Sequence, residues 1–246
     1  MSRSRATGEI EVLAAGLDLE DATLAGLLAL AELDDPTAER LPLRRRRVAE
    51  AILRMVLGRR LGCPPSQVAI ARSPQGKPHL SQRCSQAAYG PPGQPQRDRQ
   101  PPLRFSLAHS GACALIALSA DRDVGVDLES IDLRRPHERL ARRWFTTAEH
   151  ALVASRPTLA DRACAFYRLW TAKEACVKAT GEGLAALRQV EICGDEALWL
   201  RPRLGSVRWR VQELDLGPGW AAAVAAPGLD WRATLECWRP FPQPQP

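Results

Sequence analysis

Residues 124–129 read Val-Gly-Val-Asp-Leu-Glu, so three aliphatic residues alternate with Gly125, Asp127 and Glu129. Side chains of a β-strand point alternately to its two faces, which predicts a buried aliphatic face and a second face shared by the glycine and the acids. Because Gly125 has no side chain, we expect an open face with space beside the carboxylates. Two neighbouring acids repel each other and commonly hold a cation or an Arg or Lys partner, and hard oxygen ligands suit Mg²⁺. The pattern is equally typical of an edge strand with ordinary surface acids.

A long helix is expected further along the chain, over residues 161–180, ended by a glycine cap. At steps of three and four residues, one of its faces carries two aromatic residues and then Glu174 and Lys178. A face that combines aromatic, acidic and basic side chains is compatible with a functional site. Taken alone, it is explained as well by a simple Glu174–Lys178 ion pair.

Two further segments carry polar residues at the ends of predicted elements. A strand over residues 103–108 ends at His109-Ser110-Gly111, and an earlier turn contains Gly76-Lys77-Pro78. A lone histidine in such a place is more often a structural residue than a ligand. The motifs of serine hydrolases, zinc hydrolases, P-loop proteins and dinucleotide-binding proteins are absent from the sequence. Those classes therefore have no support.

The remaining chain mixes helices and strands, which indicates an α+β protein. Residues 44–61 predict a helix, and the basic run at 44–47 within it is by itself most simply a solvated face. Residues 81–102 are rich in Gln, Pro, Gly and Arg and predict a mobile surface insertion. The other expected helices cover 136–144 and follow a capping box at Thr146 and Glu149. The other expected strands begin near residue 10 and cover 68–71, 114–119, 190–193, 198–201, 207–214, 220–225 and 231–238.

Composition excludes several classes of protein. The chain has 246 residues, of which 45% are hydrophobic and 25% charged, as is ordinary for a globular protein. No apolar run approaches the roughly 18 residues needed to span a bilayer, and acids follow the basic N-terminus, so we expect a soluble, cytoplasmic protein without a membrane partner. Seven cysteines at unpaired spacings argue against a zinc ribbon or a disulfide framework. A net charge of +6 indicates an anionic partner: nucleic acid, a phosphorylated cofactor or an acidic protein.

Five motifs occur in an order typical of one enzyme family. They are Gly76-Lys77-Pro78, Phe105-Ser106-Leu107-Ala108-His109-Ser110-Gly111, Gly125-Val126-Asp127-Leu128-Glu129, Phe145 with Glu149, and Trp170-Thr171-Ala172-Lys173-Glu174-Ala175 with Lys178. On these motifs the chain resembles the 4′-phosphopantetheinyl transferase superfamily, in its long, surfactin-synthetase-activating (Sfp) type. The resemblance covers residues 40–185 clearly, apart from 81–102, and it favours the functional interpretation of each motif.

The resemblance implies an α+β fold of two similar halves with pseudo-twofold symmetry and the active site at their interface. The halves would span residues 1–120 and 121–239, followed by a disordered tail at 240–246, in a monomer. The implied enzyme, of the holo-[acyl-carrier-protein] synthase type, moves 4′-phosphopantetheine from coenzyme A to a serine of an apo acyl or peptidyl carrier protein. It needs Mg²⁺ and releases adenosine 3′,5′-bisphosphate. Such carriers present the serine on an acidic helix, so a basic enzyme surface would speed encounter.

The resemblance also implies roles for individual residues. Asp127, Glu129 and Glu174 would hold Mg²⁺ on the diphosphate, with Glu174 also acting as the general base. Lys178 would neutralise the diphosphate, while Lys173 follows the motif with a catalytic or a structural role. The other side chains implied to bind coenzyme A are Arg45, with its register left open, Arg72, Lys77 and His109.

Two positions depart from the family pattern. Ser106 stands where Asn is frequent, and Ala108 where Ser is frequent, which predicts weaker coenzyme A binding through the lost hydroxyl. Two other functions remain open: a non-catalytic homologue that binds carrier proteins, and a basic nucleic-acid-binding protein, for which no recognition motif is present. The sequence also leaves open the carrier and its pathway (fatty acid, polyketide, nonribosomal peptide or lysine), the acceptance of acyl-coenzyme A and the role of the insertion.

Overall fold

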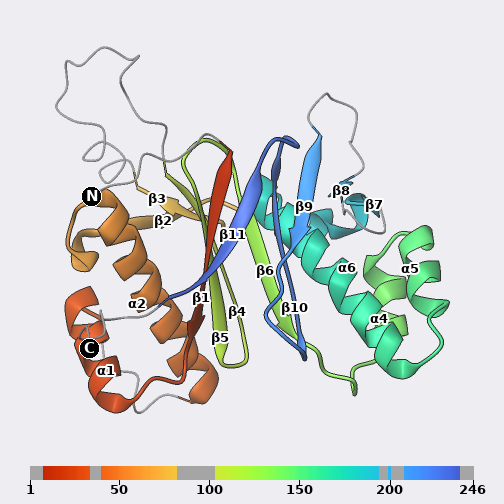
Figure 1. Ribbon diagram of the computed structural model, residues 1–246, viewed down its shortest axis with the longest axis horizontal. Helices are drawn as coiled ribbons and strands as arrows, with labels where there is room; N and C mark the ends of the chain where they lie inside the picture. The colour runs from red at the N-terminus through yellow and green to blue at the C-terminus, as the bar shows by residue number, and fades with distance from the viewer. Residues whose placement is uncertain (1–7, 34–39, 82–102, 194–198, 201–207, 239–246) are drawn as a thin grey trace.

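Two β-sheets pack face to face, and helices cover the outer face of each, so the molecule has four layers (Figure 1). The computed structural model describes residues 8–33, 40–81, 103–193, 199–200 and 208–238. The predicted insertion, apart from its first residue, and the predicted tail lie outside these ranges. The α+β class predicted from the sequence is confirmed.

Each sheet has its own set of strands, with short additions. The first sheet has the order β11-β1-β5-β4 and consists of β1 (Glu9–Gly16), β4 (Arg104–Ser110), β5 (Cys113–Ser119) and β11 (Arg232–Cys237). The second has the order β6-β10-β9-β8-β7 and consists of β6 (Gly125–Ser130), β7 (Ile192–Cys193), β8 (Trp199–Leu200), β9 (Trp209–Glu213) and β10 (Trp220–Pro227). A separate antiparallel pair is formed by β2 (Ile70–Arg72) and β3 (Pro78–Leu80).

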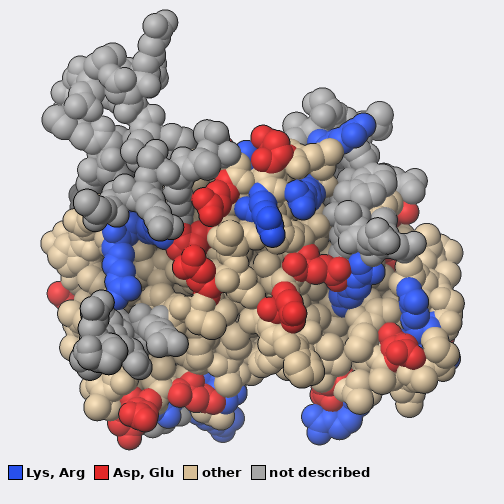
Figure 2. Space-filling model, viewed as in Figure 1, with Lys and Arg blue, Asp and Glu red and all other residues tan. Residues whose placement is uncertain are grey.

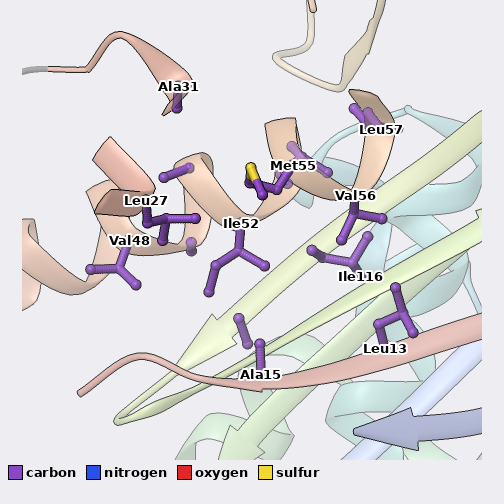
Figure 3. Packing of buried hydrophobic residues seen from close by; sticks show 14 of the residues in the cluster. Leu13, Ala15, Leu27, Ala31, Val48, Ile52, Met55, Val56, Leu57 and Ile116 are labelled. Atoms are coloured by element: carbon purple, nitrogen blue, oxygen red, sulfur yellow. The ribbon is translucent and has the colours of Figure 1, made fainter. Parts of the chain in front are cut away.

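The helices divide between the two outer layers. Those on the first sheet are α1 (Asp21–Ala31) and α2 (Leu41–Leu61), and those on the second are α4 (His137–Trp144), α5 (Thr147–Ala154) and α6 (Leu159–Thr180). Two short 3₁₀ helices are η1 (Pro65–Gln67) and η3 (Leu184–Gln189). Figure 3 shows the first core, where Ile52 and Val56 of α2 lie next to Leu13 and Ile116 of the sheet. All four of these side chains are buried, as the helical spacing of the apolar residues in α2 requires.

Helix α6 lies so close to β6 that only glycine fits at position 125. A Cβ atom built on Gly125 would stand 2.0 Å from the carbonyl oxygen of Ala175. The expectation of open space beside Asp127 is therefore wrong, because the glycine permits close packing of helix and strand. The helix face that carries the aromatic residues, Glu174 and Lys178 is largely buried: Tyr167 is only 2% exposed, whereas Lys178 is partly exposed.

The last strand of the chain joins the sheet formed by the first. β11 pairs with β1 in parallel register, with Glu9 opposite Arg232 and Ala14 opposite Cys237. The predicted boundary near residue 120 would place β11 in the C-terminal half, whereas its hydrogen bonds belong to the N-terminal sheet. Among the helices that the structure describes, none combines the length and hydrophobicity needed to cross a bilayer.

Candidate active site

The edge strands β4 and β6 meet along a seam between the two sheets. Ser106 Oγ on β4 accepts a hydrogen bond from the backbone N–H of Val126 at 3.1 Å. Ser110 Oγ, at the end of the same strand, accepts one from the N–H of Ser130 at 3.1 Å. These hydroxyls satisfy backbone donors on an edge strand. The seam therefore brings the β4 motif beside the acids of β6.

Asp127 and Glu129 of β6 and Glu174 of α6 form an acidic cluster at this seam. Burial raises the pKa of Glu129, and the charge of Asp127 raises it further. Burial, followed by repulsion from Asp127, raises the pKa of Glu174 to about 7. Within the described ranges, no group of three or more His, Cys, Asp or Glu side chains is arranged to hold a metal ion. The three predicted acids thus influence one another electrostatically without forming a closed metal cage.

Asp127 is the most deeply buried member of the acidic cluster. It is 5% exposed, and its Oδ1 accepts a hydrogen bond from Lys178 Nζ at 2.6 Å. Burial raises the pKa of Asp127, while the Lys178 ammonium opposes this shift. The other carboxylate oxygen, Oδ2, is buried without any hydrogen-bond partner. A buried acceptor left in this state is costly and is suited to a cation.

Glu129 is held by a hydroxyl group from across the seam. Ser110 Oγ donates to Glu129 Oε2 at 3.0 Å while it accepts the bond from Ser130. The N–H donor occupies a lone pair of the hydroxyl, so the hydroxyl proton points toward the carboxylate. Sequence reasoning did not assign this role to Ser110. Its position four residues after Ser106, on the same face of β4, is the signal that could have revealed it.

A cavity of about 280 Å³ opens beside Glu174 and Lys178. Another part of its wall is the predicted turn, where the stem of Lys77 lies so near Gly181 that a Cβ atom built on this glycine would stand 3.2 Å from Lys77 Cδ. Lys77 Nζ donates to the carbonyl of Ala179 at 2.5 Å. A cation at the last carbonyls of a helix is favourable, so Lys77 also holds the turn against α6.

The predicted coenzyme A ligands divide into two groups. Partial burial lowers the pKa of His109, and the charges of Lys178 and Arg46 lower it further, so the imidazole lies within electrostatic range of these two cations. Arg45 points elsewhere: its Nε and Nη2 donate to Asp18 at 2.8 and 2.6 Å. Arg72 Nη1 donates to the carbonyl of Gly76 at 3.1 Å and so braces the turn. Arg46, which the sequence analysis did not select, is the arginine that acts on His109.

Lys173, whose role the motif left open, is enclosed by the protein and lies away from the cavity. It is fully buried, and its Nζ donates to Glu149 Oε2 at 2.7 Å and to the carbonyl of Val190. Glu149 also accepts from the backbone N–H groups of Thr146 and Ile192, each at 2.8 Å. The predicted capping box is confirmed, and its glutamate joins α5, α6 and β7.

Ala108, one of the two positions that depart from the family pattern, lies away from the cavity. Ala108 is 4% exposed and packs in the core shared by the two sheets, on the same face of β4 as Ser106. A hydroxyl group at position 108 would lie in this core between the sheets. The weaker coenzyme A binding expected from the alanine stays a prediction.

Comparison with known proteins agrees with this geometry. A family model described as the 4′-phosphopantetheinyl transferase superfamily matches residues 123–225, which include β6 and α6. The 4′-phosphopantetheinyl transferase HetI of Nostoc sp. is 34% identical over 211 residues, covering 85% of this chain and 82% of that protein. AcpT of Salmonella typhimurium, a 4′-phosphopantetheinyl transferase, is 38% identical over 125 residues, or 46% of this chain and 64% of that protein. The L-aminoadipate-semialdehyde dehydrogenase-phosphopantetheinyl transferase of Xenopus laevis is 31% identical over 138 residues, which cover 54% of this chain and 42% of that protein.

The HetI match extends over most of both chains, and the family model spans the strand and the helix that carry the acidic cluster. The chain belongs to the 4′-phosphopantetheinyl transferase superfamily.

Proposed function

We propose that this protein transfers 4′-phosphopantetheine from coenzyme A to a serine hydroxyl of an apo carrier protein. The serine oxygen attacks the phosphorus that bears pantetheine, the bond from that phosphorus to the bridging oxygen breaks, and adenosine 3′,5′-bisphosphate leaves. The observation that carries the proposal is the acidic cluster with Lys178, at the seam of the sheets and beside a cavity. Membership of the superfamily supports the same reaction.

Glu174 is suited to take the proton from the serine. Its pKa of about 7 leaves a substantial fraction of the carboxylate ready to accept a proton near neutral pH. No hydrogen bond or ion pair involves this carboxylate in the part of the chain that the structure describes, and the residue lines the cavity. The base is therefore both poised and free to meet a substrate hydroxyl.

The positive side chains are suited to the phosphates. Lys178 has 32% of its side chain exposed and lines the cavity, so its ammonium can reach a diphosphate oxygen while it stays near Asp127. His109 and Arg46 lie near Lys178 and would receive a further phosphate group. Lys77 lines another part of the cavity. Arg45 and Arg72 remain predictions, and their present hydrogen bonds would have to exchange for phosphate oxygens.

The acids fit a divalent cation, on the evidence of the orphaned Oδ2 of Asp127 and the mutual repulsion of the three carboxylates. Asp127, Glu129 and Glu174 are the side chains that would hold Mg²⁺. When bound, the ion would supply positive charge to the diphosphate oxygens as charge develops on them. Lys178 already provides part of that charge. Ser110 fixes the orientation of Glu129 within the acidic cluster.

We further propose the long, Sfp-type organisation, with an N-terminal half over residues 1–120 and a C-terminal half over 121–239 acting as a monomer. One helix-covered sheet on each side of the seam supports two halves, although β11, from the C-terminal part of the chain, lies in the N-terminal sheet. Pseudo-twofold symmetry of the halves is part of the proposal.

The test is the intact mass of purified apo carrier proteins after incubation with the protein, coenzyme A and Mg²⁺. We expect a gain of one phosphopantetheine, lost when a chelator is added. The same gain with chelator present would contradict the role of the ion. If no carrier of a broad panel gained mass while coenzyme A still bound, the non-catalytic alternative would replace the proposal.

A further inference from the structure

The first sheet is bonded to the second at both of its edges. One edge is β4, whose serine hydroxyls accept hydrogen bonds from β6 at the seam. The other edge is β11, which lies between β1 and the strands of the second sheet (Figure 1). Among the described residues, no strand pairs with the outer side of β11. Side chains of β9 bind the backbone groups there instead.

Gln212 of β9 makes two hydrogen bonds to one residue of β11. Its side-chain Nε2 donates to the carbonyl of Ala233, and its Oε1 accepts from the N–H of Ala233, both at 3.0 Å. These are the two bonds that a residue of a neighbouring strand would make, so the amide satisfies both backbone groups of this edge position. The outer edge of β11 is thereby attached to the second sheet.

Arg210, two residues earlier on β9, makes a related contact two residues earlier along the chain of β11. Its Nη1 donates to the carbonyl of Trp231 at 2.6 Å, and its guanidinium lies 5.4 Å from the centre of the Trp231 ring. Trp231 itself is only 2% exposed. Alternate residues of a strand share a face, so Arg210 and Gln212 both point toward the edge of β11. We call Arg210, Gln212, Trp231 and Ala233 the β9–β11 contact.

Nonpolar packing between the two sheets does not by itself set their relative tilt. The facing sides share a core of aliphatic residues, and the hydrophobic effect that holds such a core has no preferred direction. Figure 2 shows acidic and basic side chains interspersed over one face of the molecule, without a broad patch of one sign, so charge does not orient the sheets on this face. Hydrogen bonds are directional. The tilt of the first sheet therefore depends on its two bonded edges, β4 and β11.

The tilt matters because the proposed coenzyme A site has parts on both sheets. His109 lies on β4 of the first sheet, and Arg46 lies on α2, which covers that sheet. Lys178 lies on α6, which covers the second sheet and carries or adjoins the whole acidic cluster. A ligand whose phosphates meet cations from both sides needs a fixed spacing across the seam, whereas the acidic cluster and Lys178 all lie on one side.

We propose that Arg210 and Gln212 are positioning residues of the transferase. By holding β11 they fix the tilt of the first sheet, and with it the spacing across the seam between His109 and Arg46 on one side and Lys178 on the other. This inference rests on the proposed function. Neither Arg210 nor Gln212 lines the cavity, so both act only through the sheet. Their loss should therefore weaken coenzyme A binding while the chemical step is largely kept.

The first test compares Gln212→Ala with Leu28→Ala, at a buried position of α1 in the core outside the first sheet. Leu28→Ala leaves a cavity and should lower the free energy of unfolding at least as much as Gln212→Ala. At a temperature where all proteins are folded, we expect KM for coenzyme A to rise about tenfold in Gln212→Ala, with kcat changed by less than about twofold. KM should be unchanged in Leu28→Ala. An equal rise in both variants, or an unchanged KM in Gln212→Ala, would overturn the proposal.

Hydrogen exchange of single amides tests the seam without any substrate. The N–H groups of Val126 and Ser130 donate to the serines of β4, so their exchange reports separation of the two sheets. In Gln212→Ala we expect both to exchange about tenfold faster or more, beyond any change at the N–H of Ile116 within the first sheet. Equal acceleration of all three amides would indicate general destabilisation and overturn the proposal.

The exchange measurement also separates this inference from the proposed function. If the wild-type protein modified no carrier, the transferase function would fail. Selective exchange at Val126 and Ser130 in Gln212→Ala would still support the control of the seam by the β9–β11 contact. Normal transfer by the wild type with no selective exchange in the variant would overturn the inference alone.

Discussion

Two lysines of α6, five residues apart, meet buried carboxylates in opposite ways. Lys173 and Glu149 are both sealed, and every strong hydrogen bond that Glu149 accepts comes from a fixed donor of the fold. Lys178 and Asp127 make an ion pair of similar length, 2.6 against 2.7 Å, yet one oxygen of Asp127 has no partner and the lysine reaches a cavity. A completed buried pair holds the structure together, whereas an incomplete one is ready to receive a ligand.

The comparison separates two residues that belong to one motif. Lys173 and Glu174 are adjacent, but one turns inward to α5 and the other lines the cavity. Two adjacent residues of one motif therefore have different roles here. If the comparison is right, substitutions at the first pair should act on stability and substitutions at the second on catalysis.

The largest effect is expected from Lys173→Met. Removing one partner of a sealed ion pair leaves Glu149 buried beside an apolar side chain, at a cost of about 3–5 kcal/mol in the free energy of unfolding. Lys178→Met is the matched control and should cost clearly less, because water reaches the cavity beside Asp127. Urea denaturation of both variants measures the difference. An equal loss of unfolding free energy in the two variants would contradict the difference between the two ion pairs.

Asp127→Ala should lower turnover strongly and the free energy of unfolding only slightly. We expect turnover with an acidic carrier to fall about 10²–10³-fold, the usual consequence of removing one group that stabilises developing charge. Because Oδ2 is unsatisfied in the folded protein, the loss of unfolding free energy should be less than half of that in Lys173→Met. Asp215→Ala, at an exposed acid far along the chain, is the control for turnover. Near-normal turnover of Asp127→Ala at saturating Mg²⁺ would remove Asp127 from the site.

The pH dependence sharpens the comparison at Glu174. Its pKa is about 7 in the folded protein against an ordinary 4.5, so the folded state holds the proton more tightly. This contribution to stability is complete below about pH 4.5 and is lost as pH rises to about 7, at up to about 1.4 kcal/mol per pH unit. Glu174→Gln should therefore gain stability over the wild type across that window. Glu236→Gln, at an exposed site, should show no such gain.

The same titration governs catalysis with the opposite sign. Only the deprotonated Glu174 accepts a proton, so kcat/KM should rise with pH, with a midpoint at about pH 7, and level off above it. In Glu174→Gln this limb should disappear from the residual activity. A limb of unchanged midpoint in the variant would assign it to another group.

The smallest effect is expected at the seam. Ser110→Ala removes one hydrogen bond to Glu129. We expect apparent Mg²⁺ affinity to fall about tenfold, or roughly 1.4 kcal/mol, just below the range of about 1.5–3 kcal/mol for hydrogen bonds to charged groups. Ser110→Thr keeps a hydroxyl group and should retain the Mg²⁺ affinity of the wild type. Ser106→Ala removes the corresponding backbone contact of β4 without touching an acid, so it should alter stability alone. Equal effects of the two alanine variants on Mg²⁺ affinity would contradict the positioning role.

The periodic parts of the fold were predictable from the sequence. The alternation in β6, the spacing in α6 and the capping box at Thr146 each follow from local rules, and each appears where those rules place it. Gly125 was misjudged because a missing side chain signals either open space or close packing. Only the position of α6, which is a long-range property, decides between the two.

The site was predictable as a set of residues but not as a set of contacts. Spacing could suggest that Glu174 and Lys178 share a face, yet nothing local indicated that Lys178 would pair with Asp127, 51 residues earlier. The choice between Arg45 and Arg46 depends on Asp18, which lies between β1 and α1 and accepts hydrogen bonds from Arg45. Pairings of this kind are fixed by tertiary packing.

The parallel pairing of β1 with β11 also affects how the protein is made. During synthesis, β1 leaves the ribosome more than 200 residues before the strand that will lie along its edge. Contacts between such distant segments form late, because closing the intervening loop costs entropy before any contact is gained. The N-terminal sheet must wait with an open edge, where it can pair with other chains or meet chaperones. Translation therefore has to pass residue 237 before the first sheet has all of its strands.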